Sequence, residues 1–99
     1  MKVLWTLLAE QRATEAFDWI AAERPAAAVA WLERVLDQVA RLAQFPDLGR
    51  PVPELGRPEF RQLLVKPYRI VYRRDQTRIA LLTVRHVRRT WNPREISED

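Results

Sequence analysis

Residues 60–87 of the chain read FRQLLVKPYRIVYRRDQTRIALLTVRHV, and this stretch predicts three consecutive strands. Runs of aliphatic, aromatic and β-branched side chains alternate in it with short polar breaks, as expected of strands joined by tight turns. The apolar run Ile79-Ala80-Leu81-Leu82 indicates that the third strand is a buried central one. We expect strands at 60–65, 68–73 and 78–87, with turns at Lys66-Pro67 and Asp75-Gln76.

Two helices are predicted upstream of these strands, from Leu7 to Ala22 and from about Ala26 to Gln44. Thr6 can cap the first helix, and Pro25 suits the first position of the second. Because the linker at 23–25 is so short, the helices should form an antiparallel hairpin. Each helix carries one apolar face, since its apolar residues recur every three or four positions. These residues are Ala13, Phe17, Ile20 and Ala21 in the first helix, and Ala28, Leu32, Val35, Val39 and Leu42 in the second.

The remaining segments complete a β-α-α-β-β-β order. Residues 2–6 read as a short strand. Residues 46–58 contain four of the seven prolines and both glycines, which indicates a loop of fixed local geometry. Residues 88–99 show no clear period, and the tail after about residue 89 could be flexible. We therefore expect a single α+β domain over 1–99, with the N-terminal helical hairpin packed on one face of a small, mostly antiparallel sheet and the other face free for function.

The composition excludes several classes of protein. The chain has no cysteine and one histidine, and no spaced carboxylate cluster, so we expect neither a disulfide framework nor a metal site. Only two glycines are present, so a glycine-rich phosphate loop is absent and no cofactor is expected. The apolar start of the chain is too short for a signal peptide, and no apolar run approaches the roughly 18 residues that span a bilayer. A cytoplasmic protein with no membrane partner is expected.

The positive charge lies in the C-terminal half of the chain. The net charge is +4, and residues 46–99 hold twelve basic side chains, eleven of them arginine, against seven acidic ones. Arginine suits planar contacts with phosphate or carboxylate groups. This half therefore predicts a surface for an anionic partner, either nucleic acid or an acidic protein segment. The alternative is an arginine-rich surface that is simply solvated.

Five short motifs follow one another along residues 3–89. They are Val3-Leu4-Trp5-Thr6 with Ala9; Ile20-Ala21 followed by Pro25 and Ala27-Ala28; Phe45-Pro46-Asp47-Leu48-Gly49-Arg50; Tyr68-Arg69-Ile70-Val71-Tyr72; and Val84-Arg85-His86-Val87-Arg88-Arg89. These motifs resemble those of the RelE/ParE family of toxins, with the ParE-like branch closer. Each motif is weak alone, and their order and spacing make the resemblance specific.

The resemblance implies the toxin of a type II toxin–antitoxin system, neutralised by an antitoxin that wraps it with a largely helical C-terminal segment. ParE-like members inhibit DNA gyrase, whereas RelE-like members cut mRNA on the ribosome. The nuclease branch often ends in a catalytic tyrosine, and this chain has none after Tyr72. Gyrase inhibition without enzymatic activity is therefore favoured. The alternatives are a ribosome-dependent endoribonuclease and a non-toxic module that only binds antitoxin.

A nuclease would need a base, an acid and cations for the phosphorane charge. Arg69 sits where the resemblance places a phosphate-binding arginine, His86 could be the acid because histidine titrates near neutrality, and Glu54 could be the base. These three are the catalytic candidates only if the chain is a nuclease. Arg61, Arg69 and Arg85 could converge from neighbouring strands, and Arg50 could reach the same place. The alternative is that these arginines form ion pairs with Glu54, Glu59 or the antitoxin.

Two further sets of residues are candidates for binding. The target or a nucleic acid would be contacted by arginines, and the antitoxin by tryptophans left exposed on the helices or after the last strand, although Trp91 could equally pack back on the domain. The arginines are Arg50, Arg61, Arg69, Arg85, Arg88 and Arg89, and the tryptophans are Trp19, Trp31 and Trp91.

Overall fold

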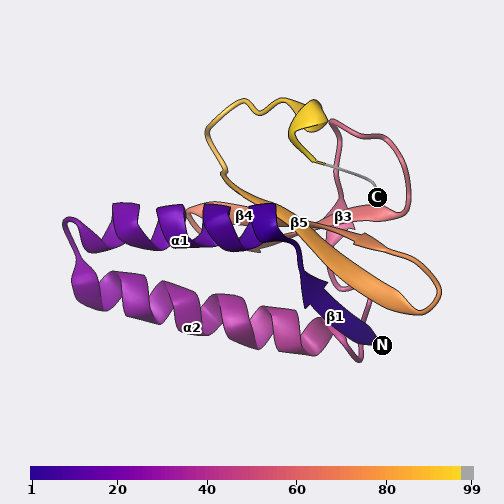
Figure 1. Cartoon of the computed structure of the whole chain (residues 1–99), viewed down its shortest axis with the longest axis horizontal. Helices are drawn as coiled ribbons and strands as arrows, with labels where there is room; N and C mark the ends of the chain where they lie inside the picture. The colour runs from indigo at the N-terminus through magenta and orange to yellow at the C-terminus, as the bar shows by residue number, and fades with distance from the viewer. Residues whose placement is uncertain (97–99) are drawn as a thin grey trace.

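The computed structural model of the chain describes residues 1–96, and the end of the tail, 97–99, lies outside the described residues. The predicted order of elements is confirmed, with boundaries that differ by one or two residues (Figure 1). Two short elements, β2 and η1, were not predicted, because a few residues are too short for any period. The elements are β1 (Lys2–Trp5), α1 (Leu7–Ala21), α2 (Pro25–Leu42), β2 (Arg50–Pro51), β3 (Phe60–Val65), β4 (Tyr68–Arg74), β5 (Arg78–His86) and the 3₁₀ helix η1 (Pro93–Glu95).

The strands form one sheet in the order β1-β5-β4-β3-β2. β1 runs parallel to β5, and the other pairs are antiparallel, as expected of a mostly antiparallel sheet. The register between β4 and β5 shifts once, between Val71 and Tyr72. Val71 lies opposite Thr83, whereas Tyr72 lies opposite Leu81. Leu82 is the extra residue of this bulge, and it packs on the opposite face of the sheet from Leu81.

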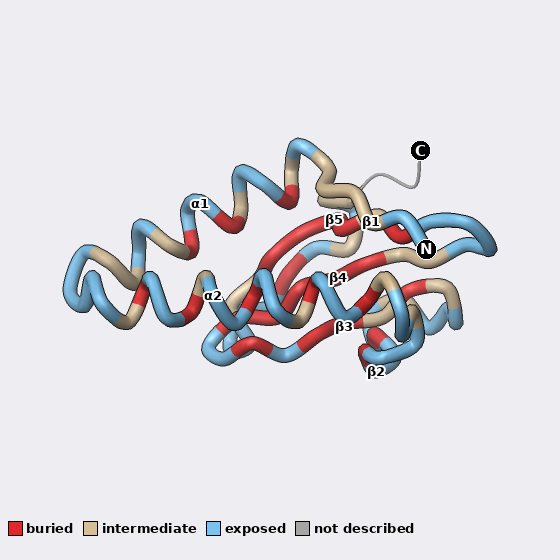
Figure 2. Tube along the Cα trace, turned by 90° about the horizontal axis from the view of Figure 1, so that it is seen from below, coloured by how far each residue is buried: buried red, intermediate tan, exposed pale blue. Residues whose placement is uncertain are grey.

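The two helices cover one face of the sheet and bury the main core there. Thr6 caps α1 by accepting a hydrogen bond from the Ala9 amide at 3.1 Å, and Pro25 opens α2, both as expected. Figure 2 shows buried positions recurring along both helices and along most of β4 and β5. The expected apolar stripes supply this core, which also takes in the ring of Trp31 from α2 and Ile70, Tyr72, Ile79 and Leu81 from the sheet.

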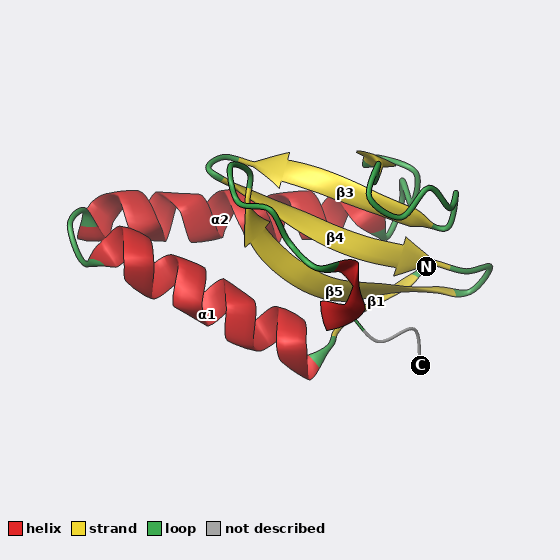
Figure 3. Ribbon diagram, turned by 90° about the horizontal axis from the view of Figure 1, so that it is seen from above, coloured by secondary structure: helices red, strands yellow, loops and turns green. Residues whose placement is uncertain are grey.

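The other face of the sheet is not free, contrary to expectation. Figure 3 shows the tail and η1 crossing in front of β4 and β5, on the side away from α2. Trp91 and Ile96 from the tail, together with Val52 and Leu55 from the long loop, cover this face. They form a second, smaller core with Phe60, Val71, Ala80 and Leu82. We call this loop and tail layer, residues 52–58 and 91–96, the cover.

The loop after α2 is fixed by the hydroxyl of Tyr72, which explains two of the sequence motifs. That hydroxyl donates to the carbonyl of Pro46 at 2.8 Å and accepts from the amide of Gly49 at 2.9 Å. A Cβ on Gly49 would lie 2.6 Å from the carbonyl oxygen of Gln62 and 2.7 Å from the Tyr72 ring. Glycine is therefore required by this close approach, and the expected fixed geometry of the loop is confirmed.

Candidate functional site

Arg69 lies at the centre of the face under the cover and is held there from three sides. Its guanidinium donates to both carboxylate oxygens of Glu54, at 3.2 and 2.5 Å, and to the side-chain oxygen of Gln62 at 3.0 Å. It also lies over the ring of Trp91, with 5.4 Å to the ring centroid. The indole N–H of Trp91 donates to Glu54 at 2.8 Å, so the three side chains form one closed group.

Glu54 is ionised and engaged within this group. The hydrogen bonds from Arg69 are the largest cause that lowers the pKa of Glu54 to about 2. A carboxylate with so low a pKa is a weak base near neutral pH. Glu54 and Arg69 do lie together, but each neutralises the charge of the other. This is the ion-pair alternative considered for the arginines.

His86 lies on the opposite face of the sheet from Arg69. It is paired in register with Tyr68, and the two rings meet edge to face with centroids 5.3 Å apart. Its Nδ1 accepts a hydrogen bond from the amide of Arg88 at 3.1 Å. Since Arg85 and not His86 is the register partner of Arg69, the three nuclease candidates do not form one site.

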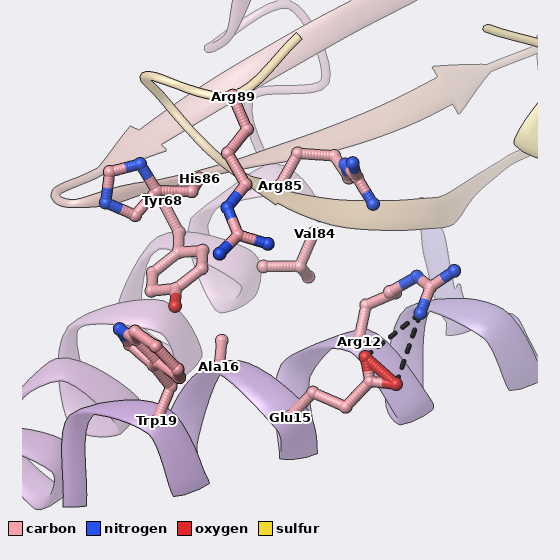
Figure 4. A pocket seen from close by; sticks show the side chains of 9 residues that line it. All are labelled: Arg12, Glu15, Ala16, Trp19, Tyr68, Val84, Arg85, His86 and Arg89. Carbon is pink, nitrogen blue, oxygen red and sulfur yellow. Dashed lines mark hydrogen bonds and ion pairs between the residues drawn. The ribbon is translucent and has the colours of Figure 1, made fainter. Parts of the chain in front are cut away.

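A hollow of about 160 Å³ opens between α1 and the end of β5 (Figure 4). Figure 4 shows the side chain of Arg89 reaching down between Tyr68 and Val84 toward Trp19 and Ala16 on α1. Arg12, which also lines the hollow, pairs with Glu15 at 3.0 Å and with Glu95 of η1. The residues lining the hollow are Arg12, Glu15, Ala16, Trp19, Tyr68, Val84, Arg85, His86 and Arg89.

Sequence reasoning missed part of this hollow. Arg12, Glu15, Ala16 and Trp19 recur at helical spacing, which places them on one side of α1. That spacing was a usable signal, but nothing in the sequence linked it to Arg85, His86 and Arg89 seventy residues later.

Carboxylates of the same chain neutralise three of the six candidate arginines. Arg61 lies 3.4 Å from Asp47, Arg69 pairs with Glu54, and Arg85 lies 3.4 Å from Glu95. Arg50, Arg88 and Arg89 are exposed, and no carboxylate among residues 1–96 is within ion-pair distance of them. The second group is therefore the one available to a partner.

The predicted convergence of the arginines is only partly confirmed. Arg69 and Arg85 are neighbours on β4 and β5, as expected. Arg61 belongs to the other face, because it alternates along β3 with Gln62, which contacts Arg69. It binds the carbonyl of Gly49 there, at 2.8 Å. Arg50 lies on β2, two strands away from β4.

Of the three tryptophans expected to contact the antitoxin, only Trp19 is exposed. Its side chain is 69% exposed, against 1% for Trp31 and 4% for Trp91. Trp31 belongs to the main core and donates to the carbonyl of Val65 at 2.9 Å, and Trp91 belongs to the cover. Both of these rings are buried because each completes a core, and for Trp91 this is the alternative in which it packs back on the domain.

The described part of the chain contains neither a candidate metal site nor a candidate membrane-spanning helix. Residues 1–96 contain no group of three or more His, Cys, Asp or Glu side chains that could hold a metal ion. Over the same residues, no helix has both the length and the apolar character needed to cross a membrane.

Comparisons with known proteins agree with this fold. The family model described as the ParE toxin of the type II toxin–antitoxin system parDE matches residues 3–91. A solved structure of the chromosomal ParDE toxin–antitoxin system from P. aeruginosa is similar, with a TM-score of 0.73 and 24% identity. The match covers 88% of this chain and 96% of that chain, and it shows a shared fold. A comparison with curated protein sequences gave no significant match.

Proposed function

Because this chain belongs to the ParE toxin family of type II toxin–antitoxin systems, we propose that it inhibits DNA gyrase by binding. The family also implies an antitoxin partner, which in this proposal neutralises the toxin. Both events would take place in the cytoplasm, where gyrase acts on the chromosome. No bond to the chain is made or broken in this mechanism, and the toxin need not be an enzyme.

The observation that carries the proposal is the state of Arg69. A nuclease would aim this guanidinium at a phosphorane, with an acid and a base beside it. Here Arg69 is buried under Trp91 and already shares the charge of Glu54. His86, the candidate acid, lies on the other face of the sheet. Arg69 and Glu54 therefore bind each other under the cover, and His86 is too far round the sheet to act with them.

The side chains that remain exposed suit binding of a partner better than catalysis. Arg50, Arg88 and Arg89 are exposed and free of ion pairs to residues 1–96, and exposed apolar side chains such as Trp19 and Val87 accompany them. Arginine and tryptophan are enriched at the centres of protein–protein interfaces. A surface of this kind can hold a large protein target without a catalytic group.

One observation favours cleavage of mRNA on the ribosome as a second candidate. The hollow brings His86, Tyr68 and Arg89 together, and these are residue types that can move a proton and bind a phosphate. The carboxylate in the hollow, Glu15, is bound to Arg12 at 3.0 Å and so is not a free base. Cleavage at ribosome-occupied codons would require this site and not the Glu54–Arg69 group.

The test is a supercoiling assay with purified chain and purified gyrase. We expect inhibition of supercoiling that increases with toxin concentration and is reversed by the antitoxin encoded beside the toxin. A parallel reaction with translating ribosomes should leave mRNA intact. Full gyrase activity at every toxin concentration, with mRNA cut in the parallel reaction, would reject the proposal in favour of the second candidate.

A further inference from the structure

The hollow between α1 and β5 carries one positive charge that residues 1–96 do not neutralise. Arg12 is balanced by Glu15, and Arg85 lies 3.4 Å from Glu95, which also binds Arg12. Arg89 has no ion-pair partner among residues 1–96. With His86 neutral, three guanidinium groups thus face two carboxylates, and a ligand with a single negative charge would complete the balance.

Hydrogen-bond donors in the hollow also lack acceptors within the described residues. The hydroxyl of Tyr68 has no hydrogen-bond partner among residues 1–96, and burial, the main cause, raises the pKa of Tyr68, so this hydroxyl remains a donor. In a neutral His86 ring, Nδ1 accepts from the amide of Arg88, so the proton is on Nε2. A carboxylate accepts from several such donors at once.

The remaining wall of the hollow is apolar. Ala16 and Val84 are buried there, and the ring of Trp19 stands 69% exposed beside them. Tryptophan and arginine are both enriched among the residues that contribute most of the binding energy of a protein interface. The ligand should therefore place an apolar side chain on Trp19 next to its acidic group.

These features fit a polypeptide better than a nucleic acid. Binding of a phosphate backbone relies on several unneutralised cations along a track. Among residues 1–96 the hollow has a single excess positive charge, because Glu15 and Glu95 already balance Arg12 and Arg85. Its volume of about 160 Å³ suits one side chain. An antitoxin segment of net negative charge with apolar anchors is the partner that matches.

We propose that this hollow is a subsite that holds one acidic side chain of the antitoxin, with a neighbouring apolar side chain of the antitoxin on Trp19. Arg89 binds the carboxylate, and Tyr68 donates a further hydrogen bond to it. The subsite selects antitoxins that place an acidic residue at this position. The inference rests on the neutralisation by an antitoxin in the proposed function, and does not depend on gyrase being the target.

The first experiment measures binding of the full-length toxin to the full-length protein encoded by the adjacent gene, by calorimetry at two salt concentrations. Arg89→Ala should weaken binding by at least about tenfold, because it removes the charged partner of the carboxylate. The matched control is Arg41→Ala, which removes an exposed charge with no ion pair among residues 1–96 and lies outside the hollow. Its effect should stay within about threefold. Equal effects of the two variants would overturn the proposal.

A double-mutant cycle identifies the carboxylate. Each Asp or Glu of the antitoxin segment is changed to its amide and tested against the wild-type toxin and against Arg89→Ala. One antitoxin position should lose its effect almost entirely in the Arg89→Ala background. Trp19→Ala should weaken binding to wild-type antitoxin without changing this coupling. Additive effects at every position would overturn the proposal, and circular dichroism of each variant confirms that it is folded.

Toxin activity without antitoxin separates this inference from the proposed function. A coupled carboxylate together with unimpaired gyrase would retain the subsite and reject gyrase as the target. If Arg89→Ala keeps full affinity for the antitoxin but loses gyrase inhibition or mRNA cleavage, the hollow belongs to the target or to catalysis, and the inference is overturned.

Discussion

The two faces of the sheet are stabilised in different ways. The face toward α1 and α2 packs aliphatic and aromatic side chains from both helices and four strands into one continuous core. The face under the cover has a smaller core, made by a loop and a tail, with an ion pair at its centre. Glu95 holds the tail to α1 and β5 through Arg12 and Arg85.

Because of this difference, we expect the helix-covered core and the cover to differ in the free energy at which they unfold. Core elements that are joined by many regular hydrogen bonds unfold together, whereas a segment near a chain end can detach at a lower free energy. We therefore expect changes on the helix side to affect the whole domain. Changes under the cover should act mainly on the loop and tail.

Trp31→Ala and Trp91→Ala give the largest contrast, because both remove a buried indole. Trp31→Ala should lower the free energy of unfolding by about 3–5 kcal/mol, through the lost burial and the cavity that it leaves. Trp91→Ala should cost about 1–2 kcal/mol, because the tail can move away and limit the loss. Urea unfolding of both variants measures this. Equal losses would mean that the two faces form one cooperative core.

Gly49→Ala should cause the next largest loss in the free energy of unfolding. The added methyl group would overlap the Gln62 carbonyl and the Tyr72 ring, and both lie in the rigid part of the sheet. Overpacking of this kind costs about 1–3 kcal/mol. Thermal unfolding followed by circular dichroism measures the effect. A variant as stable as the wild type would show that the loop is less firmly held than its contacts with Tyr72 indicate.

Glu54→Gln should lower the free energy of unfolding by about 1–2 kcal/mol, since it leaves the buried guanidinium of Arg69 without a countercharge. The tail should also become easier to cleave, because the amide retains a single acceptor oxygen for which Trp91 and Arg69 must compete. Limited proteolysis followed by mass spectrometry gives the site of cutting. The account fails here if cleavage increases in α1 or α2 and the tail stays protected.

The same carboxylate predicts a pH dependence. Its pKa is about 2 in the folded chain and near 4.5 when unperturbed, so the folded state favours the ionised form. The stabilising contribution of Glu54 is complete above about pH 4.5 and is lost as the pH falls toward 2. Urea unfolding between pH 2 and 6 should show this loss in the wild type and a smaller one in Glu54→Gln. Parallel curves would assign the acid sensitivity to other carboxylates.

Gly56→Ala should have the smallest effect. Gly56 has a φ of 61° in the loop of the cover, and no atom lies within 4 Å of a Cβ placed there. The cost is then that of the left-handed conformation alone, about 1 kcal/mol. If Gly56→Ala lowered the free energy of unfolding more than Gly49→Ala does, the expected order of the two substitutions would be contradicted.

The helix side could be predicted from the sequence, and its apolar periods are the reason. The stripe from Ala28 to Leu42 repeats with the period of a helix and has one buried side, and along the strand beginning at Tyr68 the side chains that face the helices alternate with the period of a strand. Thr6 and Pro25 mark the helix starts by local chemistry. These signals lie within short windows of the chain, so no knowledge of distant contacts was needed.

The cover and the hollow could not be predicted in this way. Trp91 from the tail packs together with Val52 from the long loop, and irregular segments such as these have no period to read. The hollow joins Arg12 to Glu95 across most of the chain. Residue types allow the alternative in which Arg69 pairs with Glu54, but only the structure shows that Trp91 closes over the pair.

Induction of the chain alone in a bacterial host, with DNA supercoiling and mRNA integrity followed in the same culture, tests the central claim most directly. A toxin that binds gyrase should cause early loss of supercoiling while translation continues and mRNA remains uncut. Immediate arrest of translation, with mRNA cut at ribosome-occupied codons and supercoiling intact, would contradict the account.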